Sequence, residues 1–188
     1  MRRKVPTLEA QKRGGTMPHR IVAIIKVVRA LGLCLAAVLA APGPAAQARD
    51  AARLVILAAD GTQLAALDRA ALAALPQTEF TTRTIWTEGP QHFLGVSLAE
   101  LLARHDLGAV RLDLVALNDY TVSLPARAIG PVYPVIAHTR NGEPMSLRDK
   151  GPFWLLWNFD SNPDFRRETV YTRSIWQLDR ITVYPAAE

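Results

Sequence analysis

Cys34 is the only cysteine of the chain, so residues 49–188 contain no thiol. That segment cannot be cross-linked by disulfides, and it has no thiolate with which to hold a soft metal ion. Its 140 residues have the size of one domain and are enough to bury a hydrophobic core. We therefore expect a single domain over residues 49–188 that is stabilised by packing alone.

Residues 1–48 have the pattern of an export signal. A basic region precedes the apolar stretch 30–41, and Pro42-Gly43-Pro44 and Ala46-Gln47-Ala48 follow it. The stretch has 12 residues, whereas a membrane-spanning helix needs about 20. We expect cleavage near Ala48 and a periplasmic protein that does not span the membrane afterwards. An uncleaved anchor is the alternative, and Met17 is a second possible start.

The excess of positive charge lies in the export signal. Residues 1–48 hold eight Lys or Arg and one Glu, a charge of +7, against +5 for the whole chain. Residues 49–188 hold 14 basic and 16 acidic residues, a charge of −2. Nucleic-acid binding requires a basic surface that neutralises phosphates, so we expect no nucleic-acid partner.

Apolar periodicity predicts short strands and two small helices. The expected strands are 53–58, 79–87, 110–117, 120–124, 134–139 and 174–184, the expected helices are 67–75 and 98–104, and 151–157 is a dense apolar run. Ser97 and Glu100 predict a capping box at the second helix. The fold class that follows is a compact α+β domain, rich in β-structure, with a mixed, barrel-like sheet.

Four polar and aromatic segments at predicted strand ends or turns are candidate parts of a site. They are Thr81–Trp86, Asn118–Tyr120, Asp149–Trp154 and Tyr171–Trp176. Each also has a structural interpretation. Asn118 and Asp119 are typical of turns, the tryptophans are typical of a core, and Arg173 is able to form an ion pair with Asp119 or Asp149.

Several kinds of chemistry have no sequence signal here. His92, His105 and His138 lack the spacing of metal ligands, and no G-x-S-x-G turn indicates serine catalysis. No P-loop or dinucleotide-binding glycine pattern occurs either.

Longer strings carry a family resemblance. A-L-N-D-Y-T-V-S-L-P (116–125), P-M-S-L-R-D-K-G-P-F-W (144–154), Y-T-R-S-I-W-Q-L-D-R-I (171–181) and F-L-G-V-S-L-A-E-L-L (93–102) follow one another in the chain. Together they resemble the oxidoreductase molybdopterin-binding domain of the sulfite oxidase-like superfamily, and especially its small, stand-alone exported members. The resemblance covers about residues 54–184 and implies the sulfite oxidase-like fold.

Enzymes of that superfamily hold molybdenum through a pterin dithiolene and one cysteine. The corresponding stretch here, Thr81-Thr82-Arg83-Thr84, has no thiol, and a threonine hydroxyl does not replace a thiolate on this metal. Small relatives without the cysteine are thought to bind a metal-free pterin and to act as periplasmic sensors. They are thought to regulate membrane-bound enzymes of cyclic di-GMP signalling. The resemblance therefore implies a non-catalytic module whose partners are a pterin and the periplasmic domain of a membrane signalling protein.

A pterin ring needs aromatic or guanidinium planes to stack on and a carboxylate that accepts from its amino group. We expect Trp86 and Tyr120 to be the stacking walls and Asp119 to be the acceptor. Arg173 and Lys150 are the expected donors, and Asn118 and Ser174 complete the edge. The whole predicted binding set is Arg83, Trp86, Asn118, Asp119, Tyr120, Lys150, Trp154, Tyr171, Arg173 and Ser174.

Two other functions stay open at this point. One is a molybdopterin-dependent oxidoreductase whose molybdenum has oxygen donors or no protein ligand, with the cofactor performing the redox chemistry. The other is an interaction module that has kept the fold and lost the ligand.

Overall fold

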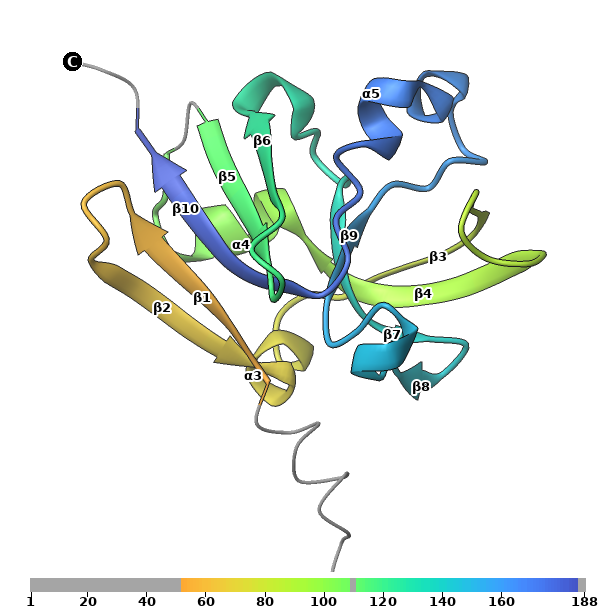
Figure 1. Cartoon of the computed structure of the whole chain (residues 1–188), viewed down its shortest axis with the longest axis horizontal. Helices are drawn as coiled ribbons and strands as arrows, with labels where there is room; N and C mark the ends of the chain where they lie inside the picture. The colour runs from red at the N-terminus through yellow and green to blue at the C-terminus, as the bar shows by residue number, and fades with distance from the viewer. Residues whose placement is uncertain (1–51, 109–110, 186–188) are drawn as a thin grey trace, which may run out of the picture. The chain divides into compact units, whose positions relative to one another are not determined.

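The computed structural model describes residues 52–108 and 111–185 (Figure 1). The predicted export signal, its cleavage site near Ala48 and the alternative start at Met17 lie outside the described residues. Within those two ranges, no helix has both the length and the apolar character needed to cross a membrane.

The first of two sheets has five strands in the order β2-β1-β10-β5-β6. Their bounds are β1 Arg53–Ala58, β2 Gln63–Asp68, β5 Arg111–Ala116, β6 Thr121–Pro125 and β10 Leu178–Tyr184. β1 and β10 pair in parallel, and the other pairs are antiparallel. Alternate residues of these strands are buried, which gives the sheet one apolar face.

The second sheet is built around β4 and β7. The strand order is β3-β4-β7-β8, and β9 pairs with the other part of β7, in all cases antiparallel. The bounds are β3 Thr78–Arg83, β4 Pro90–Ser97, β7 Val135–Arg140, β8 Glu143–Pro144 and β9 Trp154–Leu156. Gly95 of β4 lies at a register shift, where its backbone passes close to Ile136 of β7.

The helices of the described residues are short. They are α3 Arg69–Ala73, α4 Leu98–Arg104 and α5 Glu168–Tyr171, with 3₁₀ turns η1 Ala126–Ala128, η2 Leu147–Asp149 and η3 Pro163–Arg166. The predicted class, a compact α+β domain rich in β-structure, is confirmed by these elements (Figure 1).

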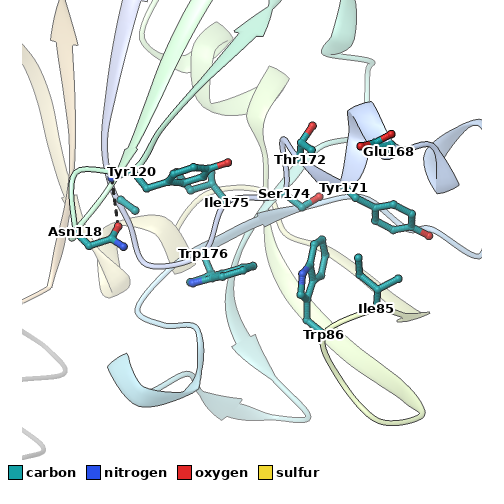
Figure 2. Close-up of a pocket in the computed structure, with 11 residues that line it drawn as sticks. Ile85, Trp86, Asn118, Tyr120, Glu168, Tyr171, Thr172, Ser174, Ile175 and Trp176 are labelled. Carbon is teal, nitrogen blue, oxygen red and sulfur yellow. Dashed lines mark hydrogen bonds between the residues drawn. The ribbon is translucent and has the colours of Figure 1, made fainter.

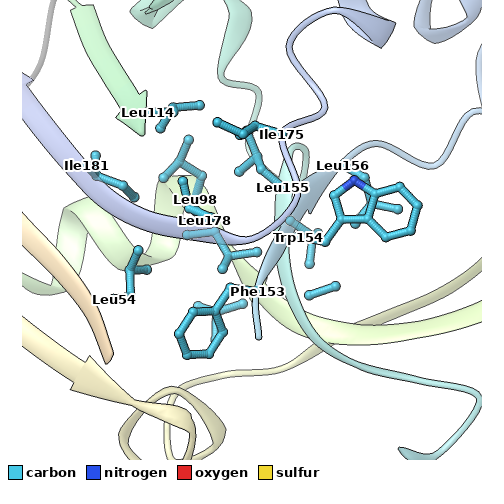
Figure 3. Packing of buried hydrophobic residues seen from close by; sticks show 14 of the residues in the cluster. Leu54, Leu98, Leu114, Phe153, Trp154, Leu155, Leu156, Ile175, Leu178 and Ile181 are labelled. Carbon is cyan, nitrogen blue, oxygen red and sulfur yellow. The ribbon is translucent and has the colours of Figure 1, made fainter. Parts of the chain in front are cut away.

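One continuous core joins both sheets to α4. Leu98, Leu101 and Leu102 of α4 are buried, as their helical spacing predicts. Figure 3 shows Leu114, Leu178 and other aliphatic side chains of the first sheet beside residues of the β9 segment. Packing without disulfides therefore accounts for the stability of the described domain.

The segment 153–155 is hydrogen-bonded to the segment that leads into β10. Leu155 N–H donates to Ile175 O at 2.9 Å, and Leu178 N–H donates to Phe153 O at 3.0 Å. Trp154 and Trp176 form a β-bridge between these two bonds. These contacts hold Trp176 beside the fully buried Trp154.

The helix predicted over 67–75 is only partly right. Residues 63–68 form β2, and the helix is confined to 69–73. The sequence Q-L-A-A-L-D has good helix formers, but pairing with β1 overrides that local preference. Asp68 caps the short helix by accepting from the backbone N–H of Ala71 at 2.8 Å.

The predicted capping box at Ser97 is wrong. The Ser97 hydroxyl does not cap α4 but donates to Pro131 O at 3.4 Å. The strand predicted over 174–184 begins only at Leu178, since Gln177 has φ +53° and breaks the extended run. β3 likewise ends at Arg83 rather than Thr87, because Thr84 and Thr87 bond to each other across a turn.

Candidate functional site

A pocket of about 720 Å³ lies where three segments meet. The loop after β3 contributes Trp86, the turn between β5 and β6 contributes Asn118 and Tyr120, and residues 168–176 supply the remaining wall (Figure 2). A volume of roughly 300–1,000 Å³ is typical of pockets that bind small organic molecules. The described domain thus has a cavity of suitable size for such a ligand.

Four of the lining residues are aromatic, namely Trp86, Tyr120, Tyr171 and Trp176, and the Trp86 ring contacts several neighbouring rings. Its ring centroid lies 5.8 Å from that of Tyr171, 5.7 Å from that of Trp176 and 5.8 Å from that of Trp154, with the planes tilted by 85°, 69° and 65°. These are edge-to-face contacts, which aromatic pairs favour. The walls therefore meet at steep angles, so a planar ligand would stack on one wall and meet the others with its edges.

The loop that carries Trp86 is held by Asp160. The Asp160 carboxylate accepts from Arg83 N–H at 2.8 Å and from the Arg166 guanidinium at 2.7 Å. The backbone N–H of Asp160 donates to the hydroxyl of the fully buried Thr82 at 3.1 Å. The hydrogen bond from the Arg83 backbone is the main reason why the pKa of Asp160 lies below its ordinary value. Arg83, a predicted ligand contact, instead anchors this loop and does not line the pocket.

Lys150 lies over the indoles next to the pocket. Its Nζ is 4.7 Å from the ring centroid of Trp176 and 5.6 Å from that of Trp154. Its backbone is left-handed, with φ +65°, and its carbonyl accepts from Gln177 N–H. A lysine ammonium at this distance interacts favourably with the indole face. Lys150 thus places a positive charge beside the Trp176 wall of the pocket.

The turn between β5 and β6 places Asn118 in the lining of the pocket and its neighbour Asp119 outside it. Asn118 lines the pocket, and its Oδ1 accepts from Tyr120 N–H at 3.3 Å, as predicted for a turn. Tyr120 also lines the pocket and is 55% exposed. Asp119 has φ +62° and bonds to Arg180 at 2.9 Å, with a side chain that is 85% exposed. The expected carboxylate acceptor therefore does not line the pocket.

Ser174 and Arg173 also lie on different sides of the chain. Ser174 lines the pocket, and its hydroxyl donates to Val170 O at 3.1 Å. Arg173 lines a second cavity of about 370 Å³, together with Arg127 and the rings of Tyr133, Trp157 and Phe165. The alternative ion pairs of Arg173 are not formed, because Asp119 pairs with Arg180 and Asp149 pairs with Arg140.

The structure thus brings half of the predicted set together around one pocket: Trp86, Asn118, Tyr120, Tyr171 and Ser174. Lys150 and the buried Trp154 support its wall, while Arg83, Asp119 and Arg173 face elsewhere. Lining residues missing from the predicted set are Ile85, Ala116, Glu168, Thr172, Ile175 and Trp176. Trp176 belongs to the candidate segment Tyr171–Trp176, so a sequence pattern does mark its position, whereas no pattern marks Glu168.

The pocket is lined by aromatic rings and by a few polar groups. The buried hydroxyl of Thr82, in the stretch where the resemblance places the metal-binding cysteine, is already bonded to Asp160 N–H. In residues 52–108 and 111–185, no three His, Cys, Asp or Glu side chains form a group able to hold a metal ion. Aromatic walls with a few polar groups fit a planar heterocycle.

Comparison with known proteins adds no assignment. No protein-family model matches the chain, and a search of curated proteins gives no significant match.

Proposed function

We propose that the protein is a non-catalytic pterin-binding module of the periplasm, with the sulfite oxidase-like fold of a molybdopterin-binding domain. The observation that carries the proposal is the pocket of about 720 Å³ walled by Trp86, Tyr120, Tyr171 and Trp176. The bound pterin would act as a signal rather than as a redox cofactor. A membrane-bound signalling protein, of the cyclic di-GMP type implied by the resemblance, would be the partner that reads it.

The physical support comes from the kind of ligand that these walls bind well. Stacking of a flat ring on an aromatic side chain contributes about 0.5–1.5 kcal/mol beyond burial. Trp176 is 37% exposed and Tyr120 is 55% exposed, so both present ring surface that a ligand would cover. Asn118, Ser174 and Thr172 supply polar atoms to the lining of the pocket. The combination fits a heteroaromatic ring with hydrogen-bonding edges.

A small organic cation is a second candidate, favoured by the presence of Glu168 among the aromatic walls. Such cages bind quaternary ammonium groups through cation–π attraction. Lys150 argues for the pterin, because its ammonium already lies 4.7 Å from the Trp176 ring centroid and would repel a second cation. Titration with choline, in parallel with a pterin, separates the two ligand classes.

The proposal is tested by titrating the purified protein with oxidised and tetrahydro forms of a simple pterin. Tryptophan fluorescence reports binding at the walls, and the melting temperature rises with ligand concentration if the native state binds it. Tyr120→Ala should weaken binding about 3–10-fold, since one stacking surface is lost. Tyr184→Ala is the matched control, because Tyr184 packs under Arg111 and away from the pocket. Absence of binding below millimolar concentration would reject the proposal.

A further inference from the structure

Glu168 is a pocket residue that the sequence did not single out. It is the first residue of α5 and lines the pocket together with Tyr171 and Thr172. Figure 2 shows it at the α5 end of the pocket, far from Asn118 and Tyr120 at the other end. Among the residues that line the pocket, a carboxylate is therefore present at the α5 end and not at the end formed by Asn118 and Tyr120.

Among the described residues, none forms a hydrogen bond or an ion pair with the carboxylate of Glu168. The adjacent Arg167 pairs instead with Asp164 at 2.5 Å. Arg173, five residues further along, lines the other cavity. Glu168 is exposed and no cation of this segment neutralises it, so its carboxylate is able to exchange water for the N–H donors of a ligand.

A carboxylate recognises best an edge with two adjacent N–H donors, because its two oxygens accept both in parallel. The 2-amino group and N3–H of a 2-amino-4-oxopteridine form such an edge. A 2,4-dioxopteridine, or the ring of a flavin, has a carbonyl in place of the amino group. That carbonyl would face the carboxylate with like partial charge. The chemistry of Glu168 therefore distinguishes rings that have the same stacking surface.

We propose that Glu168 is the specificity-determining residue of the pocket and selects 2-amino-4-oxopteridines over 2,4-dioxopteridines and flavins. It takes the role that the sequence assigned to Asp119, whose carboxylate is bonded to Arg180 outside the pocket. This inference rests on the proposed function. The ring then lies with its amino edge toward α5 and its substituent toward Asn118.

The test compares two probes, pterin (2-amino-4-oxopteridine) and lumazine (2,4-dioxopteridine), at neutral pH. Dissociation constants are measured by fluorescence for the wild type, Glu168→Gln and Glu168→Asp. The wild type should bind pterin at least about tenfold more tightly than lumazine, as expected when a charge-assisted hydrogen bond is lost. Glu168→Gln should remove or reverse that preference, because an amide N–H donates to the lumazine carbonyl. Glu168→Asp should keep the preference with weaker binding.

Glu100→Gln is the matched control, since Glu100 also lies in the first turn of a helix but not in the pocket. It should retain the wild-type preference. Equal binding of both probes by the wild type, or an unchanged preference in Glu168→Gln, would overturn the role of Glu168 while pterin binding stands. Failure of both probes to bind would instead reject the proposed function, and this inference with it.

Discussion

The carboxylate of Asp160 accepts the backbone N–H of Arg83 at 2.8 Å, three residues before the central pocket residue Trp86. The backbone N–H of Asp160 in turn donates to the Thr82 hydroxyl. The segment after β9 is thereby fixed to the end of β3. This pair of bonds determines where the chain leaves the sheet, and hence where the Trp86 ring stands.

Asp160→Ala should loosen the Trp86 loop and weaken pterin binding. We expect a loss of unfolding free energy of about 1 kcal/mol, since the carboxylate is partly exposed, and a several-fold higher dissociation constant. Chemical denaturation and fluorescence titration measure the two effects. Asp164→Ala is the control, because Asp164 forms only an exposed ion pair with Arg167. Equal ligand affinity in both variants would contradict the anchoring role.

The lowered pKa of Asp160 gives this anchor a defined pH range. The folded pKa lies below the ordinary 3.8, so the unfolded state takes up a proton first as pH falls. The stabilisation is therefore complete above pH 3.8 and is lost as pH falls through the folded pKa. The difference in melting temperature between wild type and Asp160→Ala should shrink below that pH. If the difference in melting temperature stays constant down to the lowest pH at which the protein folds, the role of the Asp160 carboxylate is contradicted.

His138 predicts a second pH effect, at higher pH. It is buried, its Nε2 bonds to Gln77 Oε1 at 2.8 Å, and its pKa is lowered by burial and then by the charge of Arg69. Because the folded pKa lies below 6.5, stability is full above pH 6.5 and falls as pH drops through the folded pKa. Thermal unfolding from pH 8 to pH 5 should show this fall. His138→Gln should make the melting temperature less dependent on pH. An unchanged dependence in this variant would contradict the role of His138.

Gly95 should be intolerant of any side chain. A Cβ at this position would lie 2.1 Å from Ile136 O, so β4 and β7 would have to separate. We expect Gly95→Ala to cost about 2–4 kcal/mol of unfolding free energy. Gly108→Ala is the control, since a Cβ there meets nothing within 4 Å. Equal melting temperatures for the two variants would contradict the close approach of β4 and β7 at Gly95.

Arg173→Ala should leave pterin affinity unchanged, although the sequence predicted a contact with the ligand. The guanidinium lines the cavity with Tyr133 and Phe165, on the other side of the chain from Ser174. Titration of Arg173→Ala beside Tyr120→Ala measures the contrast. A loss in Arg173→Ala as large as that in Tyr120→Ala would mean that the two cavities are not separate.

Sequence patterns predicted the segments of the site better than the direction of individual side chains. Trp86, Tyr120 and Tyr171 were expected at the site and do line one pocket, because aromatic residues near strand ends and turns pack where segments meet. Asp119 and Arg173 were expected at the same site but do not line this pocket, because neighbours along an irregular chain point different ways.

The fold shows the same division between local and tertiary effects. Helix 98–104 was predicted with its observed bounds, since its apolar spacing and its burial agree. β2 was not predicted: residues 63–66 were assigned to no element, and Leu67 and Asp68 were placed in the helix 67–75, because only pairing with β1 makes this segment a strand. Glu168 had no signal at all, because glutamate in a first helical turn is common and its place in a pocket depends on distant segments.

The small molecule bound to the protein is identified by mass spectrometry after freshly purified protein is denatured, and metals are measured by elemental analysis of the same sample. We predict about one pterin per chain and molybdenum far below one atom per chain, because residues 49–188 offer aromatic walls but no thiolate. One molybdenum atom per chain, with turnover of an oxyanion or sulfoxide, would contradict it.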